Sequence, residues 1–382
     1  MQIQSVKIYH IKIPLKQPFK HASAERTEAE NIIIRIQSAC GKTGWGETIP
    51  RPYVTGETIN ETLKRYRAIP SSVWAVPIKS IEDVRALLAS ASLEECLAAR
   101  CGIECALIDV LAKSAGKPVS TYLTDACSIE INKLNVSPFC YSGAIGLLPP
   151  MKTVKKAALF RFAGFKSVKI KLEKDMDADV RRLKHIRMLL GEKIGLRVDA
   201  NEAWDCEYAM RIAPVLKRYG VAGIEQPFPK ERFGDNAVLS SAVDIPIILD
   251  ESLCSLPDAQ RAVDAGINVV FCVKLPKCGG FLNALEIFAL AKKHAVPVLI
   301  SCQVGETAVL SAAGRHLAAV CPTLRWLEGS FDRFLLTRNI TDTDISFGWG
   351  GKAPSLNGAG LGIQVNETAL EAVSIDTLQV YP

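Results

Sequence analysis

The sequence predicts an α/β protein: a modified (β/α)₈ TIM barrel preceded by an α+β capping domain. The first observation is a series of short runs rich in Val, Ile and Leu, each ending abruptly in a charge, as strands buried on both faces of a parallel sheet do. The second is their spacing: the charges Lys171, Asp199, Glu225, Asp250 and Lys274 recur every 24 to 28 residues. That interval fits one strand, one helix and two loops, and a barrel places its active site at the carboxyl ends of its strands.

Residues 1–130 are predicted to form the α+β capping domain. Alternating segments at 6–14 and 31–38, and a short run ending at Glu47, predict an antiparallel meander. The turn-rich stretches 17–26 and 49–58 predict loops that can cover a site. Helical patterns follow from Thr58 to about Gly116.

Residues 131–338 are predicted to form the barrel, because the sequence pattern changes there to a repeat of strand, loop and helix. Eight parallel strands with crossover helices close into a barrel more readily than they form an open sheet. The expected strands lie at 133–136, 167–172, 196–199, 223–225, 247–250, 270–274, 296–301 and 323–328. The tail, 339–382, is rich in glycine and then alternates, so we expect it to leave the barrel and pack back on the capping domain.

Composition narrows the functional classes. The 382 residues are 48% apolar and 23% charged, as in an ordinary soluble globular protein, and the net charge of +6 is scattered along the chain. No dense basic run indicates a nucleic-acid partner, and no apolar stretch approaches the ~20 residues of a membrane span. The twelve cysteines lie mostly inside apolar runs without Cys-x-x-Cys spacing, which favours buried thiols in a reducing compartment. We therefore expect a cytoplasmic location.

Asp199, Glu225 and Asp250 would converge from adjacent strands at one barrel mouth. Each alone could be a strand-end salt bridge, but three carboxylates close together repel one another unless a cation holds them. Oxygen ligands favour Mg²⁺ over Zn²⁺, and Mg²⁺ leaves positions for a substrate carboxylate. The sequence therefore predicts a magnesium site and a small-molecule carboxylate substrate.

Lys171 and Lys274 would face this site from opposite sides, since they belong to the second and sixth of eight strands. Lys169 points the same way as Lys171, because strand side chains alternate, and a neighbouring cation lowers the proton affinity of a lysine. A metal with a lysine on each side suits removal and return of a proton α to a carboxylate. Lys166 and Lys277, nearby in sequence, are interpreted as solvated surface charges.

The order Lys-x-Lys, Asp, Glu, Asp, Lys on successive strands resembles the enolase superfamily, specifically its muconate lactonizing enzyme subgroup. The resemblance extends over nearly the whole chain, and its motifs are Ala99-Arg-Cys-Gly-Ile-Glu-Cys-Ala-Leu-Ile-Asp, Gly223-Ile-Glu-Gln-Pro, Leu249-Asp-Glu-Ser and Lys274-Leu-Pro-Lys-Cys-Gly-Gly. It implies that the three acids bind Mg²⁺, that Lys171 and Lys274 are the acid/base pair, and that Lys169 tunes Lys171 and contacts the substrate carboxylate. It also implies a homo-oligomer.

The chain departs from two patterns of this superfamily. The mandelate racemase subgroup places a His after strand seven, where this chain has Ser301-Cys-Gln-Val-Gly-Glu. Dipeptide epimerases carry Asp-x-Asp after strand eight to hold an α-ammonium, where this chain has Glu328 and Ser330. The capping loops and these strand ends set specificity in the family, so we expect the substrate to be bound by Phe19, His21, Ser23, Arg51, Tyr53, Gln303, Glu306 and Glu328.

Two enzymatic functions follow from the resemblance. One is epimerisation or racemisation of an amino-acid derivative or dipeptide through an enolate, favoured by Glu328 as a carboxylate for a cationic group. The other is cycloisomerisation of a muconate-like diacid, which needs only one lysine. A barrel that binds a ligand without turnover is a third interpretation, disfavoured because all the acid/base and metal positions are present.

Overall fold

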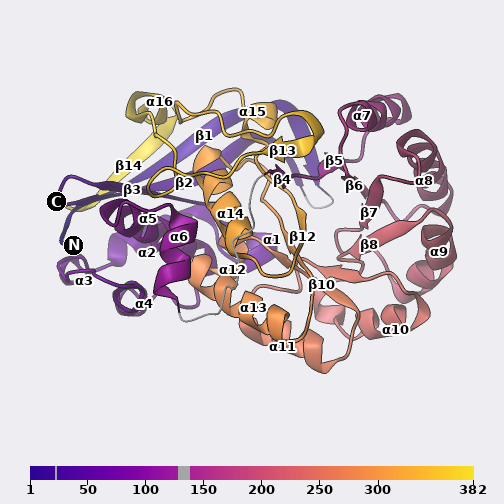
Figure 1. Cartoon of the computed structure of the whole chain (residues 1–382), viewed down its shortest axis with the longest axis horizontal. Coiled ribbons are helices and arrows are strands. Elements are labelled where there is room, and N and C mark those ends of the chain that lie inside the picture. Colours follow the sequence, from indigo (N-terminus) through magenta and orange to yellow (C-terminus); the bar gives the residue numbers. More distant parts are fainter. Residues whose placement is uncertain (22–23, 128–137) are drawn as a thin grey trace.

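The computed structural model describes residues 1–21, 24–127 and 138–382, without the side chains of 19–21, 24 and 25. It has two parts side by side: an α+β unit that contains both termini, and a (β/α)₈ barrel (Figure 1). This arrangement confirms the predicted fold class.

The capping sheet is antiparallel, with strand order β14-β1-β2-β3. The predicted loop at 17–26 is largely wrong, because β1 and β2 form a long hairpin that resumes pairing from Phe19 with Arg26 after a register shift. The 49–58 stretch contains only the short helix α1 (Pro52–Thr55). The strands are β1 (Ile3–His21), β2 (Ala24–Ser38), β3 (Thr43–Thr48) and β14 (Ser374–Tyr381).

Helix α5 (Leu97–Ser114) is buried along almost its whole length and packs on β3. Gly46 permits this contact: a Cβ on it would lie 2.0 Å from the carbonyl oxygen of Gly102. The other helices of this part are α2 (Ile59–Ala68), α3 (Ser71–Trp74), α4 (Ile81–Ser90) and α6 (Val119–Ala126).

The barrel sheet has eight parallel strands in sequence order, and a bridge between Tyr141 and Leu327 closes it. Among the described residues its first strand is Gly143–Ile145, and the segment 133–136, where the first strand was expected, lies outside the described residues. The other strands fall where they were predicted. They are β6 (Ser167–Lys171), β7 (Gly195–Asp199), β8 (Val221–Glu225), β9 (Ile247–Leu249), β10 (Val269–Val273), β11 (Val298–Ile300) and β12 (Leu324–Leu327), after β5 (Gly143–Ile145).

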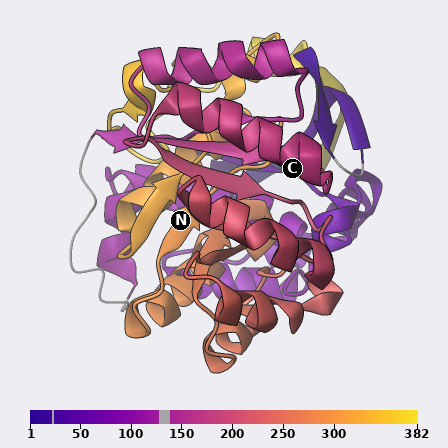
Figure 2. The same ribbon diagram turned by 90° about the vertical axis from the view of Figure 1, so that its right-hand side faces the viewer.

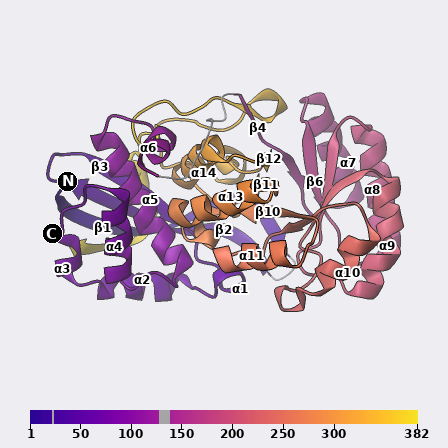
Figure 3. The ribbon, with the colours of Figure 1, turned by 60° about the horizontal axis from the view of Figure 1, so that its bottom comes forward.

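Helices surround the barrel, as the strand and helix alternation predicts. Figure 2 shows α7 to α9 stacked across the outside of the strands, and Figure 3 shows α11 and α13 on the face that is turned forward there. The helices are α7 (Pro150–Phe162), α8 (Met176–Leu190), α9 (Cys206–Arg218), η1 (Lys230–Arg232), α10 (Asp235–Ala242), α11 (Leu256–Asp264), α12 (Leu275–Cys278), α13 (Phe281–Lys293) and α14 (Ala308–Val320).

After the barrel the chain returns to the capping sheet, where β14 pairs with β1. The intervening segment contributes β13, which pairs with β4 ahead of the first barrel strand. Its elements are α15 (Asp332–Leu335), η2 (Trp349–Gly351), β13 (Lys352–Ala353) and α16 (Glu367–Glu371), with β4 at Phe139–Cys140.

Two buried carboxylates of the capping part hold the amino ends of barrel helices. Glu47 on β3 accepts hydrogen bonds from Thr307 N at 2.9 Å, Thr307 Oγ1 at 2.7 Å and Leu310 N at 2.9 Å, at the start of α14. Glu104 on α5 accepts from Leu282 N at 2.9 Å in the first turn of α13. Carboxylates are favourable at helix amino ends, where backbone N–H groups lack partners. These contacts fix the capping part over the loops that follow β10 and β11.

We expect Glu47→Gln to lower the free energy of unfolding by about 2 kcal/mol or more, because an amide leaves buried donors of α14 without an acceptor. Urea unfolding measures this change. Glu192→Gln, at an exposed turn between α8 and β7, is the matched control and should leave the midpoint unchanged. Equal midpoints for Glu47→Gln and the wild-type protein would contradict the assigned role.

Candidate active site

The three lysines and three acids predicted to form the site are at the carboxyl ends of neighbouring barrel strands. Lys169 and Lys171 lie on β6, and Asp199 and Glu225 end β7 and β8. Asp250 and Lys274 directly follow β9 and β10. Beneath them the barrel interior is filled by an apolar cluster of Ile248, Val270, Cys272 and Leu299, with Trp326 packed against it.

Lys169 joins the acids to one another. Its Nζ lies 2.7 Å from Glu225 Oε1, 2.9 Å from Glu328 Oε2 and 3.8 Å from Asp199 Oδ2. Burial works to lower the pKa of Lys169, but the surrounding carboxylates outweigh it and raise the pKa well above its usual range. Lys169 is therefore a fixed positive charge in this structure.

Lys171 has the environment expected of a base. Its ammonium group donates to the side-chain oxygen of Asn201, in the loop after β7. Burial lowers the pKa of Lys171, and the charge of Lys169 lowers it further, while Asp199 opposes both. A lysine with a lowered pKa is neutral more often near neutral pH, and only the neutral amine can accept a proton from carbon.

On the opposite side, Lys274 contacts the carboxylate of Asp250. Lys277 contacts it as well, with Nζ 3.0 Å from Asp250 Oδ1 and 2.6 Å from the Asp250 carbonyl oxygen. The interpretation of Lys277 as a surface charge is wrong: the short helix α12 turns its fully buried ammonium back under the strand ends. Burial works to raise the pKa of Asp250, but Lys274 and Lys277 prevail and lower it.

Gln226 fixes the position of Asp250, and the sequence analysis assigned it no role. It has φ +35°, a conformation uncommon outside glycine. Its Oε1 accepts hydrogen bonds from the backbone N–H groups of Asp250 at 3.0 Å and Ser252 at 3.1 Å. The motif around Glu225 contains this residue, but only the fold shows which strand its amide reaches.

Glu328 does not stand free at the end of β12. Its Oε1 lies 2.6 Å from Arg197 NH2, its Oε2 lies 2.9 Å from Lys169, and Ser301 Oγ donates to Oε2 at 3.0 Å. Burial favours a higher pKa, but Lys169 and Arg197 together lower the pKa of Glu328 to about 2. The structure thus weakens the argument that Glu328 captures a cationic group.

Arg197 was missed by the sequence analysis, although its place two residues before Asp199 puts both side chains on the same face of β7. It is fully buried, and its guanidinium lies 4.9 Å from the centroid of the Trp326 ring. This arginine neutralises Glu328 inside the barrel.

The remaining predicted substrate-binding residues are only partly described. Arg51 is buried and donates to the carbonyl oxygen of Val304 at 3.3 Å, in the loop between β11 and α14. Gln303 and Glu306 are buried in that loop, where Gln303 N donates to Glu306 Oε1 at 2.6 Å. Tyr53 is half-buried. Ser23 and the side chains of Phe19 and His21 lie outside the described residues.

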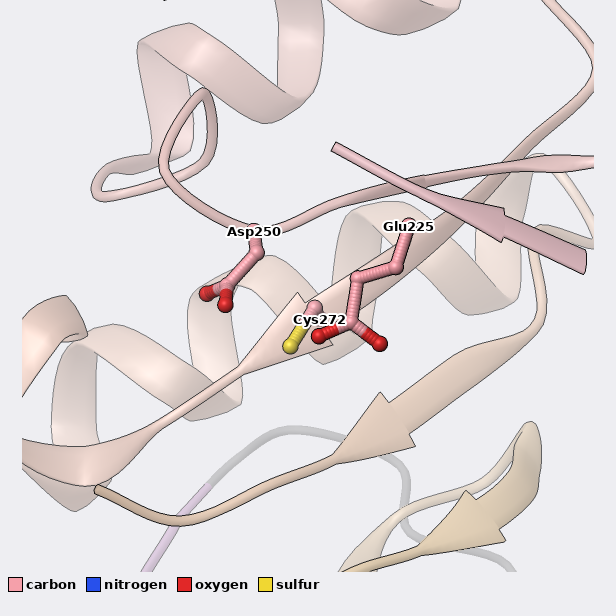
Figure 4. A group of neighbouring side chains, drawn as sticks. All are labelled: Glu225, Asp250 and Cys272. Carbon is pink, nitrogen blue, oxygen red and sulfur yellow. The ribbon is translucent and has the colours of Figure 1, made fainter. Parts of the chain in front are cut away.

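The acids fit a hard divalent cation. Glu225, Asp250 and Cys272 each offer a donor atom within 4.8 Å of the others, and Figure 4 shows both carboxylates beside the thiol. Asp199 is not in this group, but Lys169 links it to Glu225. Glu225 Oε2 is buried and makes no hydrogen bond within the described part of the chain. Burial raises the pKa of Glu225 to about 7, since Lys169 only partly offsets it. A cation held by carboxylate oxygens would relieve both effects.

The protein is a (β/α)₈ barrel in which lysines lie on opposite sides of buried carboxylates. This combination indicates an acid/base enzyme. The chain belongs to the enolase superfamily: residues 152–369 match the family described as enolase C-terminal domain-like. Residues 3–123 match the mandelate racemase / muconate lactonizing enzyme N-terminal domain.

Relatives are similar over most of the chain. It is 30% identical over 331 residues to a D-Ala-D/L-Ala epimerase of Cytophaga hutchinsonii, covering 86% of each chain. It is 28% identical to muconate cycloisomerase 1 of Rhodococcus opacus, covering 97% of this chain and 98% of that one. A crystal structure of a C. hutchinsonii dipeptide epimerase with Mg and D-Ala-L-Val matches with a TM-score of 0.89, 25% identity and full coverage of both chains. The protein is therefore an isomerase of this superfamily, whose members use Mg²⁺.

None of the described helices has the length and apolarity needed to span a bilayer.

We expect Arg197→Met to lower the free energy of unfolding by about 3 kcal/mol, because it leaves Glu328 buried with one cation fewer. Arg197→Met combined with Glu328→Gln should lose less than the single variant. Urea unfolding measures both. Arg232→Met, which breaks an exposed ion pair with Asp235, is the control and should change stability by about 0.5 kcal/mol or less. A double variant less stable than the single one would contradict this account.

Proposed function

We propose that the protein is an Mg²⁺-dependent racemase or epimerase that exchanges the proton α to the carboxylate of an amino-acid derivative. The observation that supports it most is the placement of Lys171 and Lys274 on strands two and six, with the three acids on the strands between them. Two lysines are what inversion at one carbon requires, since one removes a proton from one face and the other returns a proton to the opposite face.

Each residue has a role in this proposal. Asp199, Glu225 and Asp250 would hold the cation, which supplies electrostatic stabilisation to the substrate carboxylate as negative charge develops. Lys171 and Lys274 exchange the roles of base and acid between the two enantiomers. Lys169 keeps its charge beside Lys171, which lowers the pKa of Lys171 and favours a nearby carboxylate.

Cycloisomerisation of an unsaturated diacid is the second candidate. It needs one lysine to protonate the enolate formed when a carboxylate adds within the same molecule. The engagement of Glu328 by Arg197, Lys169 and Ser301 favours this candidate over a free dipeptide, because no ammonium group is needed. The two lysines favour racemisation.

The broader expectations stay predictions: the domain boundaries at 130 and 338, a small-molecule carboxylate as substrate, a homo-oligomer, no nucleic-acid partner and a cytoplasmic location. The scattered net charge of +6 is the support for the absence of nucleic acid.

We expect Lys171→Ala and Lys274→Ala each to lower racemisation by about 100-fold or more, since each removes the acid or base on one face. Incubation with Mg²⁺ in D₂O, using dipeptides, N-acylamino acids and muconates, would reveal the reaction by mass spectrometry. Each variant should retain exchange for only one enantiomer. Exchange of α-protons identifies racemisation, whereas loss of muconate absorbance without exchange identifies cycloisomerisation.

Lys166→Ala, at an exposed position just before β6, is the control and should match the wild-type protein. Wild-type activity in both Lys171→Ala and Lys274→Ala would contradict the assigned roles. Absence of any reaction across the library would contradict the proposed function.

A further inference from the structure

A buried thiol lies beside the carboxylates of the active site. Cys272 is on β10, two residues before Lys274, so its side chain faces the barrel interior one layer below that lysine. It is fully buried and packs among Ile248, Val270 and Leu299. The proposed reaction gives this thiol no role, because Mg²⁺ takes oxygen ligands.

Glu225, Asp250 and Cys272 form a group of three metal-binding donors. Each offers one atom, and the three atoms lie within 4.8 Å of one another. In the view of Figure 4 the sulfur lies between the two carboxyl groups. In a tetrahedral zinc site, with bonds of about 2.0 Å to oxygen and about 2.3 Å to sulfur, neighbouring donors lie roughly 3.5 Å apart. Side-chain movements of about 1 Å therefore bring these donors onto one cation.

The two carboxylates of this group have oxygen lone pairs to offer. Glu225 Oε2 is buried and accepts no hydrogen bond within the described part of the chain, and its ion pair with Arg197 NH1 spans 3.8 Å. Asp250 contacts Lys274 and Lys277 through separate oxygens, and each of these oxygens keeps a second lone pair. Both side chains can therefore bind a cation.

Two donor sets share these carboxylates. Asp199 ends β7 and Cys272 is on β10, at opposite ends of the row of four strands that carries Glu225 and Asp250 in its middle. An Asp199 oxygen completes one set, and the Cys272 sulfur completes the other. Oxygen donors suit Mg²⁺ and Mn²⁺, whereas a thiolate suits Zn²⁺ and similar soft cations. Two divalent cations this close repel each other, so we expect one set to be filled at a time.

We infer that the site binds a thiophilic divalent cation of the Zn²⁺ and Cd²⁺ class in place of Mg²⁺, through Glu225, Asp250 and Cys272. The thiol proton leaves to solvent as the thiolate binds the cation. A cation held in this way lies deeper in the barrel and is not bound by Asp199. The inference rests on the Mg²⁺ site of the proposed function, but not on the reaction that the site performs.

Ultraviolet absorption during titration with Cd²⁺ tests this inference, because a cadmium–thiolate bond gives a charge-transfer band that oxygen ligands do not give. We expect the wild-type protein to show this band and Cys272→Ser to lose it, with an affinity for Cd²⁺ lower by about tenfold or more. Cys272→Ala should behave in the same way, and circular dichroism verifies that both variants fold.

Other thiols are controlled for in the same titration. Cys40 and Cys140 are exposed and contribute equally to every protein, so the difference from Cys272→Ser is the measured quantity. Cys278→Ser, which alters another buried thiol of the barrel, is the matched control and should keep the full band.

Mn²⁺ binding, followed by electron paramagnetic resonance, reports the oxygen set. Cys272→Ser should retain Mn²⁺ binding. Asp199→Asn should weaken Mn²⁺ binding and keep the cadmium–thiolate band. Glu225→Gln should weaken the binding of both cations, because this residue belongs to both sets. Cd²⁺ added to the wild-type protein should release bound Mn²⁺.

The outcomes distinguish this inference from the function on which it rests. A band of equal strength in the wild-type protein and Cys272→Ser would overturn the inference and leave the racemase intact. Loss of the band in Asp199→Asn, or binding of Cd²⁺ without release of Mn²⁺, would do the same. A cadmium–thiolate band in a protein that binds neither Mn²⁺ nor Mg²⁺ would contradict the proposed Mg²⁺ dependence and leave the thiolate site intact.

Discussion

The mutual repulsion of buried carboxylates at the barrel mouth is the constraint on which the rest of the site depends. Asp199, Glu225, Asp250 and Glu328 lie within a few strands of one another and are almost fully buried. Charges of one sign in such surroundings persist only when cations are interleaved with them. The chain supplies Lys169 and Arg197 on one side, and Lys274 and Lys277 on the other.

This arrangement divides the positive charges into two kinds. Arg197 and Lys277 are fully buried and are held in structural contacts, so they balance charge without reaching a substrate. Lys171 is on β6 and Lys274 directly follows β10, and in the proposed function they act on the substrate carbon from opposite sides. In the proposed function, proton transfer therefore depends on residues of the barrel.

Much of the fold and the centre of the site could be predicted from the sequence. In this chain the apolar runs that form the barrel strands end in charged residues at a regular interval. This spacing placed five residues on the strands or strand ends where the structure has them: Lys171, Asp199, Glu225, Asp250 and Lys274. What failed depends on long-range geometry. The short first strand, Gly143–Ile145, has too few residues to give a periodic signal. Lys277 was misjudged because a short helix reverses its direction.

Glu328 shows the same limit. Its position at the end of β12 was evident, but its hydrogen-bond partners come from β6, β7 and the residue after β11, and no local pattern indicates that arrangement. Sequence patterns thus predict which chemistry the strand ends can perform, and tertiary packing decides which charges are left for a substrate.

The most direct test of this account is binding of Mn²⁺ as a spectroscopic substitute for Mg²⁺, followed by electron paramagnetic resonance. The account predicts one Mn²⁺ per chain that Mg²⁺ displaces, with binding lost in Glu225→Gln and preserved in the control Lys166→Ala. Unchanged Mn²⁺ binding in Glu225→Gln would contradict the claim that a cation relieves the repulsion among these carboxylates.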